Sequence, residues 1–282
     1  MNAWCLAGET LSLSQPRVMG ILNVTPDSFS DGGELPSAAD VLRRAERMIE
    51  EGAALLDVGG ESTRPGAPSV DTDEEIGRVV PAVEALSREF AVPISVDTRK
   101  ADVARKALAA GASIVNDVSA LSFDPHMGSA VAEAGAGVVL MHMRGTPADM
   151  RERAVYADVT AEVRAELAEA VDRALEAGIR PEAIALDPGF GFAKDATQSL
   201  RLLGELSKLA TLGFPMLVGP SRKSFLGEVL ALPPKERAVG TAAACVLAYL
   251  GGARIFRVHD VAPVVQALAV AAALHAETGA PA

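Results

Sequence analysis

Residues that can ionise or form hydrogen bonds follow almost every short apolar run of this chain. They are Asn23, Asp57, Asp97, Asn116 with Asp117, His142 after Met141, Asp187, Ser221 to Lys223, and Arg257 with His259. Any one of them could be an ordinary turn or helix-capping residue, because Asp, Asn and Ser are common in both places. Eight such positions along one chain are less readily explained in that way. The pattern predicts a site assembled from these residues.

The basic residues of this set indicate an anionic ligand. The chain has 26 Lys and Arg against 37 Asp and Glu, and its formal net charge is −11. An anion must therefore be held by a local basic cluster, which Arg64, Arg222, Lys223, Arg257 and His259 could provide. Arginine offers a planar fork and lysine a compact charge to phosphate oxygens. We interpret this cluster as a phosphate site.

Three oxygen-bearing side chains near the first apolar run could bind a metal ion. Asn23, Asp27 and Asp31 carry hard oxygen donors of the kind that Mg²⁺ prefers, and Mg²⁺ commonly combines a few protein ligands with substrate phosphates. The alternative for Asp27 and Asp31 is turn chemistry, because their segment is rich in Gly and Ser.

Two carboxylates and an amide suggest a second, planar ligand. Asp97, Asn116 and Asp187 could meet at one end of a barrel, where they would recognise the donor-rich edge of an amino-pyrimidinone such as a pterin or guanine. The carboxylates could instead act as a general acid–base pair, or could pair with Lys223 and Arg257.

The elements that must position these residues alternate strictly between strand and helix. Eight apolar runs are predicted as strands, at 17–23, 54–58, 93–97, 113–117, 137–142, 183–187, 215–219 and 254–258. The amphipathic segments between them are predicted as helices, at 37–51, 73–90, 100–110, 126–134, 156–177, 196–209, 224–250 with a break at Pro233–Pro234, and 261–277.

Eight strand–helix units predict a (β/α)₈ TIM barrel of the α/β class, with an open doubly wound sheet as the alternative. The carboxyl ends of barrel strands carry the active site, which is where the polar residues listed above fall. Residues 1–16 lie outside the eight units, and we expect them to form a short hairpin at the barrel floor. No linker divides the chain, so residues 1–282 are predicted to form one domain.

Composition excludes several classes of protein. An acidic balance without a block of basic residues argues against binding to nucleic acid or to a membrane surface. The longest apolar runs are too short to span a bilayer. Two cysteines cannot form a disulfide framework, and no signal peptide is visible, so we expect a cytoplasmic protein.

The residues at the strand ends resemble those of a known family. The matching segments are MGILNVTPDSFSDGG at 19–33, DVGGESTRPGA at 57–67, SVDTRK at 95–100, NDVS at 116–119, MHMRGTP at 141–147, DPGFGFAK at 187–194, LVGPSRKSFLG at 217–227 and RVHDV at 257–261. In this order they are similar to the dihydropteroate synthases, the pterin-binding barrel enzymes of folate biosynthesis.

The resemblance implies a reaction and its requirements. In this family p-aminobenzoate displaces pyrophosphate from 6-hydroxymethyl-7,8-dihydropterin diphosphate to give 7,8-dihydropteroate, with Mg²⁺ as cofactor. It implies small-molecule substrates and a homodimer. A diphosphate leaving group and an acidic pterin pocket favour a dissociative, SN1-like displacement, with no covalent enzyme intermediate.

The resemblance also implies roles for individual residues. Lys223, Arg257 and Asp97 would be the catalytic groups. The pterin would be bound by Asp97, Asn116, Val118, Met141, Asp187 and Lys223. The diphosphate would be bound by Asn23, Thr63, Arg64, Arg257 and His259. The p-aminobenzoate would contact Phe29, Pro65, Phe192 and Ser224. Asn23 and Asp31 would hold the metal. One departure is Ala193, which stands where the family usually has a glycine.

Three other functions can be weighed on the same residues. A pterin-dependent methyltransferase would keep the pterin carboxylates but would not need SRKS and RVH around a diphosphate. A non-catalytic paralogue would be expected to lack Asn23 or the basic cluster, and this chain has both. A barrel that binds phosphosugars would not explain Asp97, Asn116 and Asp187 together.

Overall fold

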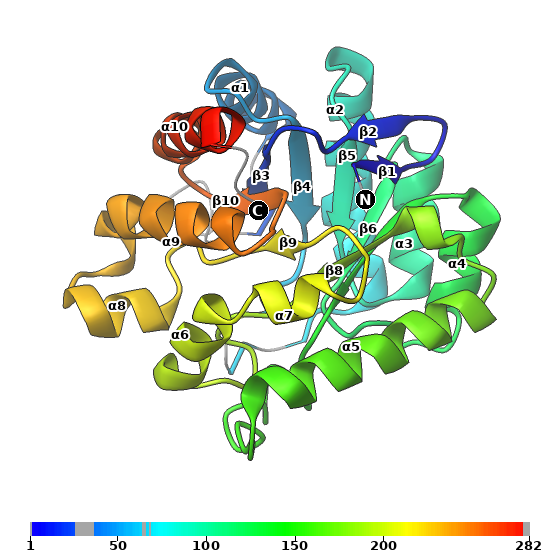
Figure 1. The fold of residues 1–282 in the computed structure, drawn as a ribbon. Coiled ribbons are helices and arrows are strands. Elements are labelled where there is room, and N and C mark those ends of the chain that lie inside the picture. The colour runs from blue at the N-terminus through cyan, green and yellow to red at the C-terminus, as the bar shows by residue number, and fades with distance from the viewer. Residues whose placement is uncertain (1, 26–36, 64–65, 68, 279–282) are drawn as a thin grey trace.

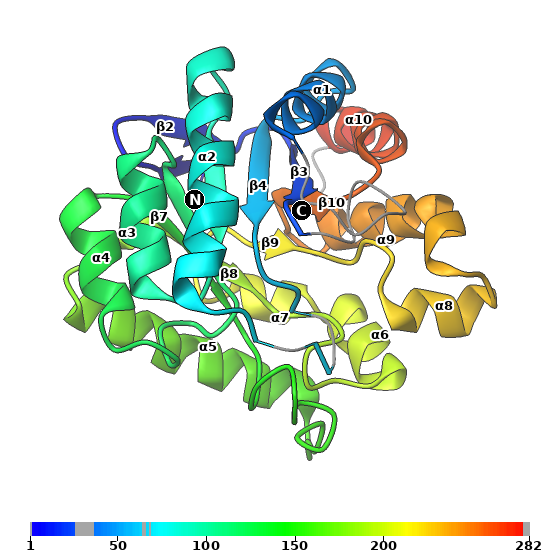
Figure 2. The same ribbon diagram turned by 180° about the vertical axis from the view of Figure 1, so that it is seen from behind.

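Eight parallel strands form the centre of the molecule, and helices lie outside them (Figures 1 and 2). The computed structural model describes residues 2–25, 37–63, 66–67 and 69–278. The strands are β3 (Arg17–Asn23), β4 (Leu55–Gly59), β5 (Ile94–Asp97), β6 (Ile114–Asp117), β7 (Gly137–Met141), β8 (Ile184–Asp187), β9 (Leu217–Val218) and β10 (Ile255–Val258).

The strand order decides between the two predicted architectures. Neighbours in the sheet follow one another in the sequence from β3 to β8, and β10 pairs with both β3 and β9. A parallel bridge between Leu186 and Met216 joins β8 to the segment before β9, and the Leu186 N–H donates to the Pro215 carbonyl at 2.9 Å. The sheet therefore curls into a nearly closed barrel. The barrel prediction is confirmed, and the open doubly wound sheet is wrong.

The helices cover the outer face of the strands. They are α1 (Ala38–Glu50), α2 (Thr72–Glu89), α3 (Ala101–Ala109), α4 (Met127–Ala134), α5 (Val159–Glu176), α6 (Ala196–Gly204), α7 (Ser207–Ala210), α8 (Ser224–Leu230), α9 (Ala238–Leu250) and α10 (Val261–Thr278). Two short 3₁₀ turns, η1 (Pro181–Ala183) and η2 (Pro234–Glu236), complete the described elements.

Local chemistry explains where several helices begin. The side chains of Ser37 and Asp195 each accept a hydrogen bond from the third helical N–H, and their own backbone N–H groups donate to the side chains of Asp40 and Gln198, which forms capping boxes at α1 and α6. The side chains of Asp71 and Asp158 cap α2 and α5 by accepting hydrogen bonds from backbone N–H groups of the first helical turn.

One predicted helix is divided in the structure. The segment predicted as a single helix at 196–209 forms α6 and α7, which are separated at Glu205 and Leu206. Leu206 is fully buried, and a side chain on Gly251 would come within 3.0 Å of its Cβ atom. Packing against the end of α9 therefore accompanies the break.

The predicted N-terminal hairpin is present at the barrel floor. Strands β1 (Ala3–Cys5) and β2 (Thr10–Ser12) pair in antiparallel register, and they lie at the end of the barrel where the strands begin (Figures 1 and 2). Trp4 is fully buried, and its indole N–H donates to the Ala183 carbonyl at 2.8 Å. Its cluster contains inward-facing residues of the barrel: Met19, Leu55, Ile114, Val139, Ala185, Leu217 and Ile255.

Two further observations concern the molecule as a whole. Among the described helices, none combines the length and the apolar character needed to cross a bilayer. Both cysteines are free, and Cys245 is buried within α9.

Candidate active site

The site residues continue the inward-facing rows of the barrel. Side chains two positions apart on a strand point the same way, so Asp97, Asn116 and Asp187 follow the interior positions Ser95, Ile114 and Ala185. Backbone pairing places Asn23 beside Gly59, Gly59 beside Asp97, and Asp97 beside Asn116. Met141 and Asp187 pair at the ends of β7 and β8. The structure therefore brings the predicted pterin carboxylates and amide to one end of the barrel.

Arg257 forms an ion-paired centre with two carboxylates. Its Nε donates to Asp57 and its Nη2 to Asp97, both at 2.6 Å. Asp57 is fully buried, Asp97 is nearly so, and the Arg257 side chain keeps one-fifth of its surface exposed. Asp57 is one of the polar residues predicted at the strand ends, but its pairing with Arg257 was not predicted, because 200 residues separate the two.

Each of these two carboxylates keeps one oxygen without a hydrogen-bond partner. Oδ1 of Asp57 and Oδ1 of Asp97 are buried and find no partner within the described part of the chain. Burial raises the pKa of Asp97 to about 7, against the lowering effect of Arg257. A buried acceptor of this kind is costly unless a donor reaches it. Asp97 is therefore suited to accept a hydrogen bond from a ligand in the barrel.

Asp187 is fixed from the loop that follows it. Its Oδ1 accepts a hydrogen bond from the Gly189 N–H at 2.7 Å. Burial raises the pKa of Asp187 to about 6, although the Gly189 N–H and the charge of Lys223 act in the opposite direction. Asp187 thus titrates close to neutral pH, as carboxylates in functional sites often do.

An apolar wall stands beside these carboxylates. Val118, Met141 and Phe192 belong to one buried cluster, together with Met150 and Ala193. The Lys223 ammonium lies 3.8 Å from the centre of the Phe192 ring, which is a cation–π contact. The structure therefore joins both predicted pterin walls to a residue predicted to contact p-aminobenzoate.

The loop after β9 is shaped by an arginine. Arg237 donates to the carbonyl groups of Arg222 and Lys223, both at 3.1 Å. A Cβ atom on Gly227 would lie 2.1 Å from the guanidinium, so a side chain there would displace the guanidinium from its present position. Arg237 thereby holds the segment from which Lys223 and Ser224 lead into α8.

His259 is oriented by this same loop. The hydroxyl of Ser221 lies 3.0 Å from His259 Nδ1 and accepts the His259 backbone N–H at 3.1 Å. Arg222, which the sequence placed in the basic cluster, forms two hydrogen bonds with Asp260 instead, at 2.6 and 3.0 Å.

Asn23 carries a hard oxygen of the kind that Mg²⁺ takes as a ligand. A Cβ atom built on Gly59 would lie 3.5 Å from both Asn23 Oδ1 and the Cβ of Asp97, so the amide oxygen borders the space left by the missing side chain. The described residues contain no cluster of three or more His, Cys, Asp or Glu side chains that could enclose an ion. A single hard oxygen fits Mg²⁺, which often completes its shell with water and phosphate.

Several predicted site residues cannot be placed. Phe29, Asp31, Arg64 and Pro65 lie outside the described residues. Thr63 is partly buried in the segment after β4. The roles given to all predicted site residues stay predictions.

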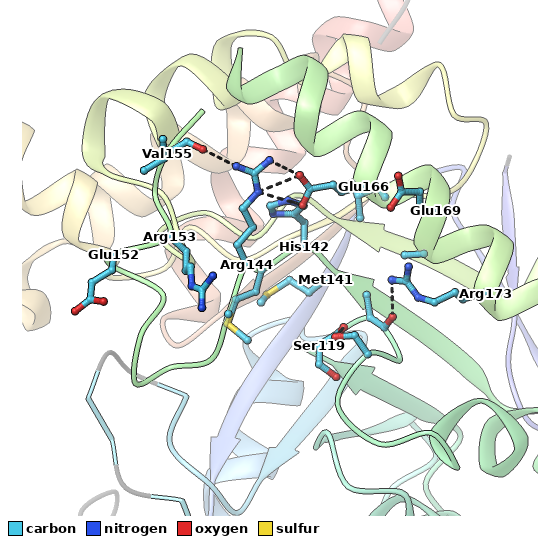
Figure 3. Close-up of a pocket in the computed structure, with 16 residues that line it drawn as sticks. Ser119, Met141, His142, Arg144, Glu152, Arg153, Val155, Glu166, Glu169 and Arg173 are labelled. Carbon is cyan, nitrogen blue, oxygen red and sulfur yellow. Dashed lines mark hydrogen bonds and ion pairs between the residues drawn. The ribbon is translucent and has the colours of Figure 1, made fainter. Parts of the chain in front are cut away.

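A second polar network was missed by the sequence analysis. Arg144 and His142 converge on Glu166 from the loop after β7 (Figure 3). On its other side, His142 Nδ1 lies 2.8 Å from the ammonium of the buried Lys194. A buried lysine leaves little trace in a sequence, so position 194 could only have been suspected from the motif around it.

An adjoining cavity of about 580 Å³ opens beside this network (Figure 3). Its wall includes Met141, His142, Arg144 and Glu166, but none of the strand-end carboxylates. It is therefore a neighbour of the predicted pterin pocket, with Met141 as a common wall.

Comparison with known proteins agrees with this geometry. Residues 19–259 match the model of the family described as pterin binding enzyme. A dihydropteroate synthase from Synechocystis is 51% identical over 258 residues, which cover 91% of this chain and 89% of the relative. The chain belongs to the dihydropteroate synthase family.

Solved structures of dihydropteroate synthases superpose closely. The enzyme of Yersinia pestis, in a complex with a sulfonamide drug, has a TM-score of 0.93 at 45% identity, with 97% of this chain and 99% of that chain covered. The enzyme of Xanthomonas albilineans, with 4-aminobenzoic acid, has a TM-score of 0.91 at 47% identity, with 98% of both chains covered. The chain is thus an enzyme, a transferase with dihydropteroate synthase activity.

Proposed function

We propose that the strand-end site joins p-aminobenzoate to 6-hydroxymethyl-7,8-dihydropterin diphosphate by a dissociative displacement. The observation that carries this proposal is the buried set of Asp97, Asn116 and Asp187 beside the ion-paired Arg257. This set combines acceptors for a pterin edge with a cation for a diphosphate, as the reaction requires. The solved relative that contains 4-aminobenzoic acid supports the choice of the second substrate.

The pterin would be held by charge and shape together. Asp97 and Asp187 would accept hydrogen bonds from the N–H groups of the pterin ring, and the Asn116 amide would offer both a donor and an acceptor. Val118 and Met141 would cover the apolar faces of the ring. Asp97 Oδ1, which is buried without a partner among the described residues, supports this arrangement.

The diphosphate would leave from the basic side of the site. Breaking the C–O bond gives both electrons to the diphosphate oxygen and leaves a cation on the pterin methylene carbon. Arg257 and His259 would stabilise the departing charge, while Asp97 and Asp187 would stabilise the pterin cation. We expect Mg²⁺, held by Asn23 and by the predicted ligand Asp31, to neutralise phosphate charge when it is bound.

The arylamine would then add to the cation without an enzyme nucleophile. The nitrogen lone pair of p-aminobenzoate forms the new C–N bond, and the nitrogen afterwards releases a proton. Phe192 and Ser224, with the undescribed Phe29 and Pro65, would form its pocket. Lys223, which lies over the Phe192 ring, would stand between the two substrates.

Two single variants test this assignment separately. Asp187→Asn should weaken binding of the pterin part, so that both the pterin alcohol and its diphosphate bind less tightly in calorimetry. Arg257→Ala should weaken binding of the diphosphate more than that of the alcohol. If both variants kept wild-type affinities and full turnover, the proposed site would be wrong.

Binding and turnover measured on the wild-type chain separate the proposal from its competitors. A non-catalytic paralogue would bind the pterin diphosphate without releasing pyrophosphate. A pterin-dependent methyltransferase would not distinguish the diphosphate from the alcohol, because it has no use for a diphosphate site.

We also propose that a second copy of this chain covers α9 and α10, and that the enzyme acts in the cytoplasm. Val239 and Leu247 on α9 and Val270 on α10 expose more than half of their surfaces. The two helices pack side by side, and the rings of Tyr249 and His275 meet edge to face at 5.9 Å. Free cysteines support a reducing compartment.

A further inference from the structure

A buried lysine joins two neighbouring loops at the top of the barrel. Lys194 retains 7% of its surface and lies in the loop between β8 and α6. Its ammonium lies 2.8 Å from His142 Nδ1, 2.9 Å from the Phe192 carbonyl and 3.1 Å from the Gly189 carbonyl. An ammonium has three N–H donors, and these are its three nearest acceptors, with the His142 carbonyl as a fourth at 3.4 Å. The lysine is therefore bonded both to its own loop and to the end of β7.

The proton arrangement of His142 follows from this contact. An ammonium can only donate, so Nδ1 accepts and the ring proton resides on Nε2, 3.0 Å from Glu166 Oε2. Burial and the nearby charge of Lys194 lower the pKa of His142 to about 4, so the ring is neutral at pH 7. Glu166 is held in turn by Arg144 (Figure 3).

The charge of Lys194 depends on these surroundings. Burial lowers the pKa of Lys194 to about 7, against the raising effects of Asp187 and Glu166, while Lys223 and Arg144 lower it further. The acceptors that bind the ammonium favour its charged form and so act against the effect of burial. His142 Nδ1 is the nearest of them.

The loop that Lys194 holds carries groups of the active site. Gly189 packs directly against the His142 carbonyl, because a Cβ atom there would lie 2.1 Å from its oxygen. The Phe192 ring lies beneath the Lys223 ammonium, and the Phe192 backbone carbonyl is one of the acceptors of Lys194. The backbone of Asp187 belongs to β8 and is held by pairing with Met141, so only its hydrogen bond from the Gly189 N–H depends on the loop. Losing the lysine should therefore displace Phe192 more than Asp187.

We propose that Lys194 is a positioning residue for the arylamine side of the site, and that it acts by tying the β8–α6 loop to His142 at the end of β7. This inference rests on the proposed function, in which Phe192 contacts p-aminobenzoate and Asp187 contacts the pterin.

The first test replaces the ammonium by an apolar group of similar length. Lys194→Met should raise the KM for p-aminobenzoate about tenfold, because small misplacements at a reacting centre have effects of this size or larger. The affinity for the pterin diphosphate should change less than threefold. Lys106→Met, at an exposed position on α3, is the matched control and should leave both values unchanged.

A second pair of variants separates positioning from simple stability. In His142→Asn the amide oxygen can take the place of Nδ1 and still accept from Lys194. In His142→Gln the amide group takes the place of Nε2, so the link to Glu166 can persist while Lys194 loses its nearest acceptor. The Asn variant should keep a KM for p-aminobenzoate close to the wild-type value, and the Gln variant should approach that of Lys194→Met.

The outcomes are distinct. Equal effects of the two His142 variants, or an unchanged KM for p-aminobenzoate in both Lys194→Met and His142→Gln, would overturn the inference. A loss of folded protein lowers kcat without this selective change in KM. If Lys194→Met does not fold, the two His142 variants still decide. An inactive wild-type enzyme would instead contradict the proposed function.

Discussion

At the scale of single residues, the site depends on carboxylates that are buried where their charge is unfavourable. Burial raises the pKa values of Asp97 and Asp187 to about 7 and about 6. A folded-state pKa above the unfolded value means that folding binds protons, so each group's contribution to stability is lost as pH rises through the folded pKa. These side chains therefore reduce stability at neutral pH, which is consistent with a role in binding.

The pH dependence of pterin binding should reflect the protonation of Asp187. Its carboxylate accepts hydrogen bonds from the ring, so affinity should fall as pH drops through about 6 and the group takes up a proton. Calorimetric titrations with the pterin alcohol from pH 5 to pH 8 measure this. In Asp187→Asn the part of the decline centred near pH 6 should vanish; if it persisted unchanged, another group would be responsible.

Asp57 should contribute as much to kcat/KM as the residues that contact substrate. It is fully buried and fixes Arg257 through Nε at 2.6 Å. Asp57→Asn removes a charged partner, and we expect kcat/KM for the pterin diphosphate to fall at least about tenfold, or ~1.4 kcal/mol.

Steady-state kinetics measure the effect of Asp57→Asn. Glu84→Gln, which alters an exposed pair with Arg88, is the control and should behave as wild type. A wild-type kcat/KM in Asp57→Asn would show that Asp97 alone suffices to orient Arg257.

At the scale of elements, the sequence predicted what is local and missed what is brought together by folding. The strand Arg17–Asn23 has the predicted bounds, since its apolar run and flanking polar residues define it. The break between α6 and α7 directly follows Gly204, which the predicted helix at 196–209 ran through, and it coincides with the packing of Leu206. Lys194 meets His142 across 52 residues, and Asp57 meets Arg257 across 200. No rule based on the spacing of residues along the chain predicts contacts between such distant residues.

The turn after β8 should tolerate no side chain at Gly189. Its φ of +68° favours glycine, and a Cβ atom would lie 2.1 Å from the His142 carbonyl oxygen, which belongs to the backbone and cannot rotate away. Gly189→Ala should lower the free energy of unfolding by at least ~2 kcal/mol, because strain and overlap combine.

Gly213→Ala is the matched control for this turn. Gly213 also has a positive φ, but no atom lies within 4 Å of the added Cβ, so about 1 kcal/mol is expected. Thermal unfolding of the two variants gives the comparison. Equal losses of unfolding free energy in Gly189→Ala and Gly213→Ala would mean that the β8–α6 loop can move away from β7 at little energetic cost.

At the scale of the whole molecule, a barrel closed at its floor presents its chemistry at the opposite end. The hairpin with Trp4 fills the end where the strands begin, and the buried carboxylates lie where they finish. The outer faces of α9 and α10 lie on the side of the barrel, where a second copy can contact them without covering either end.

Solution mass should show whether these faces meet. The wild-type chain of 29.1 kDa should sediment as a dimer, and Val270→Glu should shift it to the monomer, because a charge would be buried at the interface. Leu175→Glu alters an exposed apolar residue of α5 and should leave the dimer intact. A monomeric wild type, or a dimer in all three proteins, would exclude this face.

The most direct measurement is simultaneous release of pyrophosphate and formation of dihydropteroate by the purified chain with Mg²⁺, the dihydropterin diphosphate and p-aminobenzoate. We predict equal amounts of the two products, with dihydropteroate formation dependent on p-aminobenzoate and abolished by a chelator. Pterin diphosphate that binds without yielding either product would contradict the account, because the site would then bind its ligand but not perform the displacement.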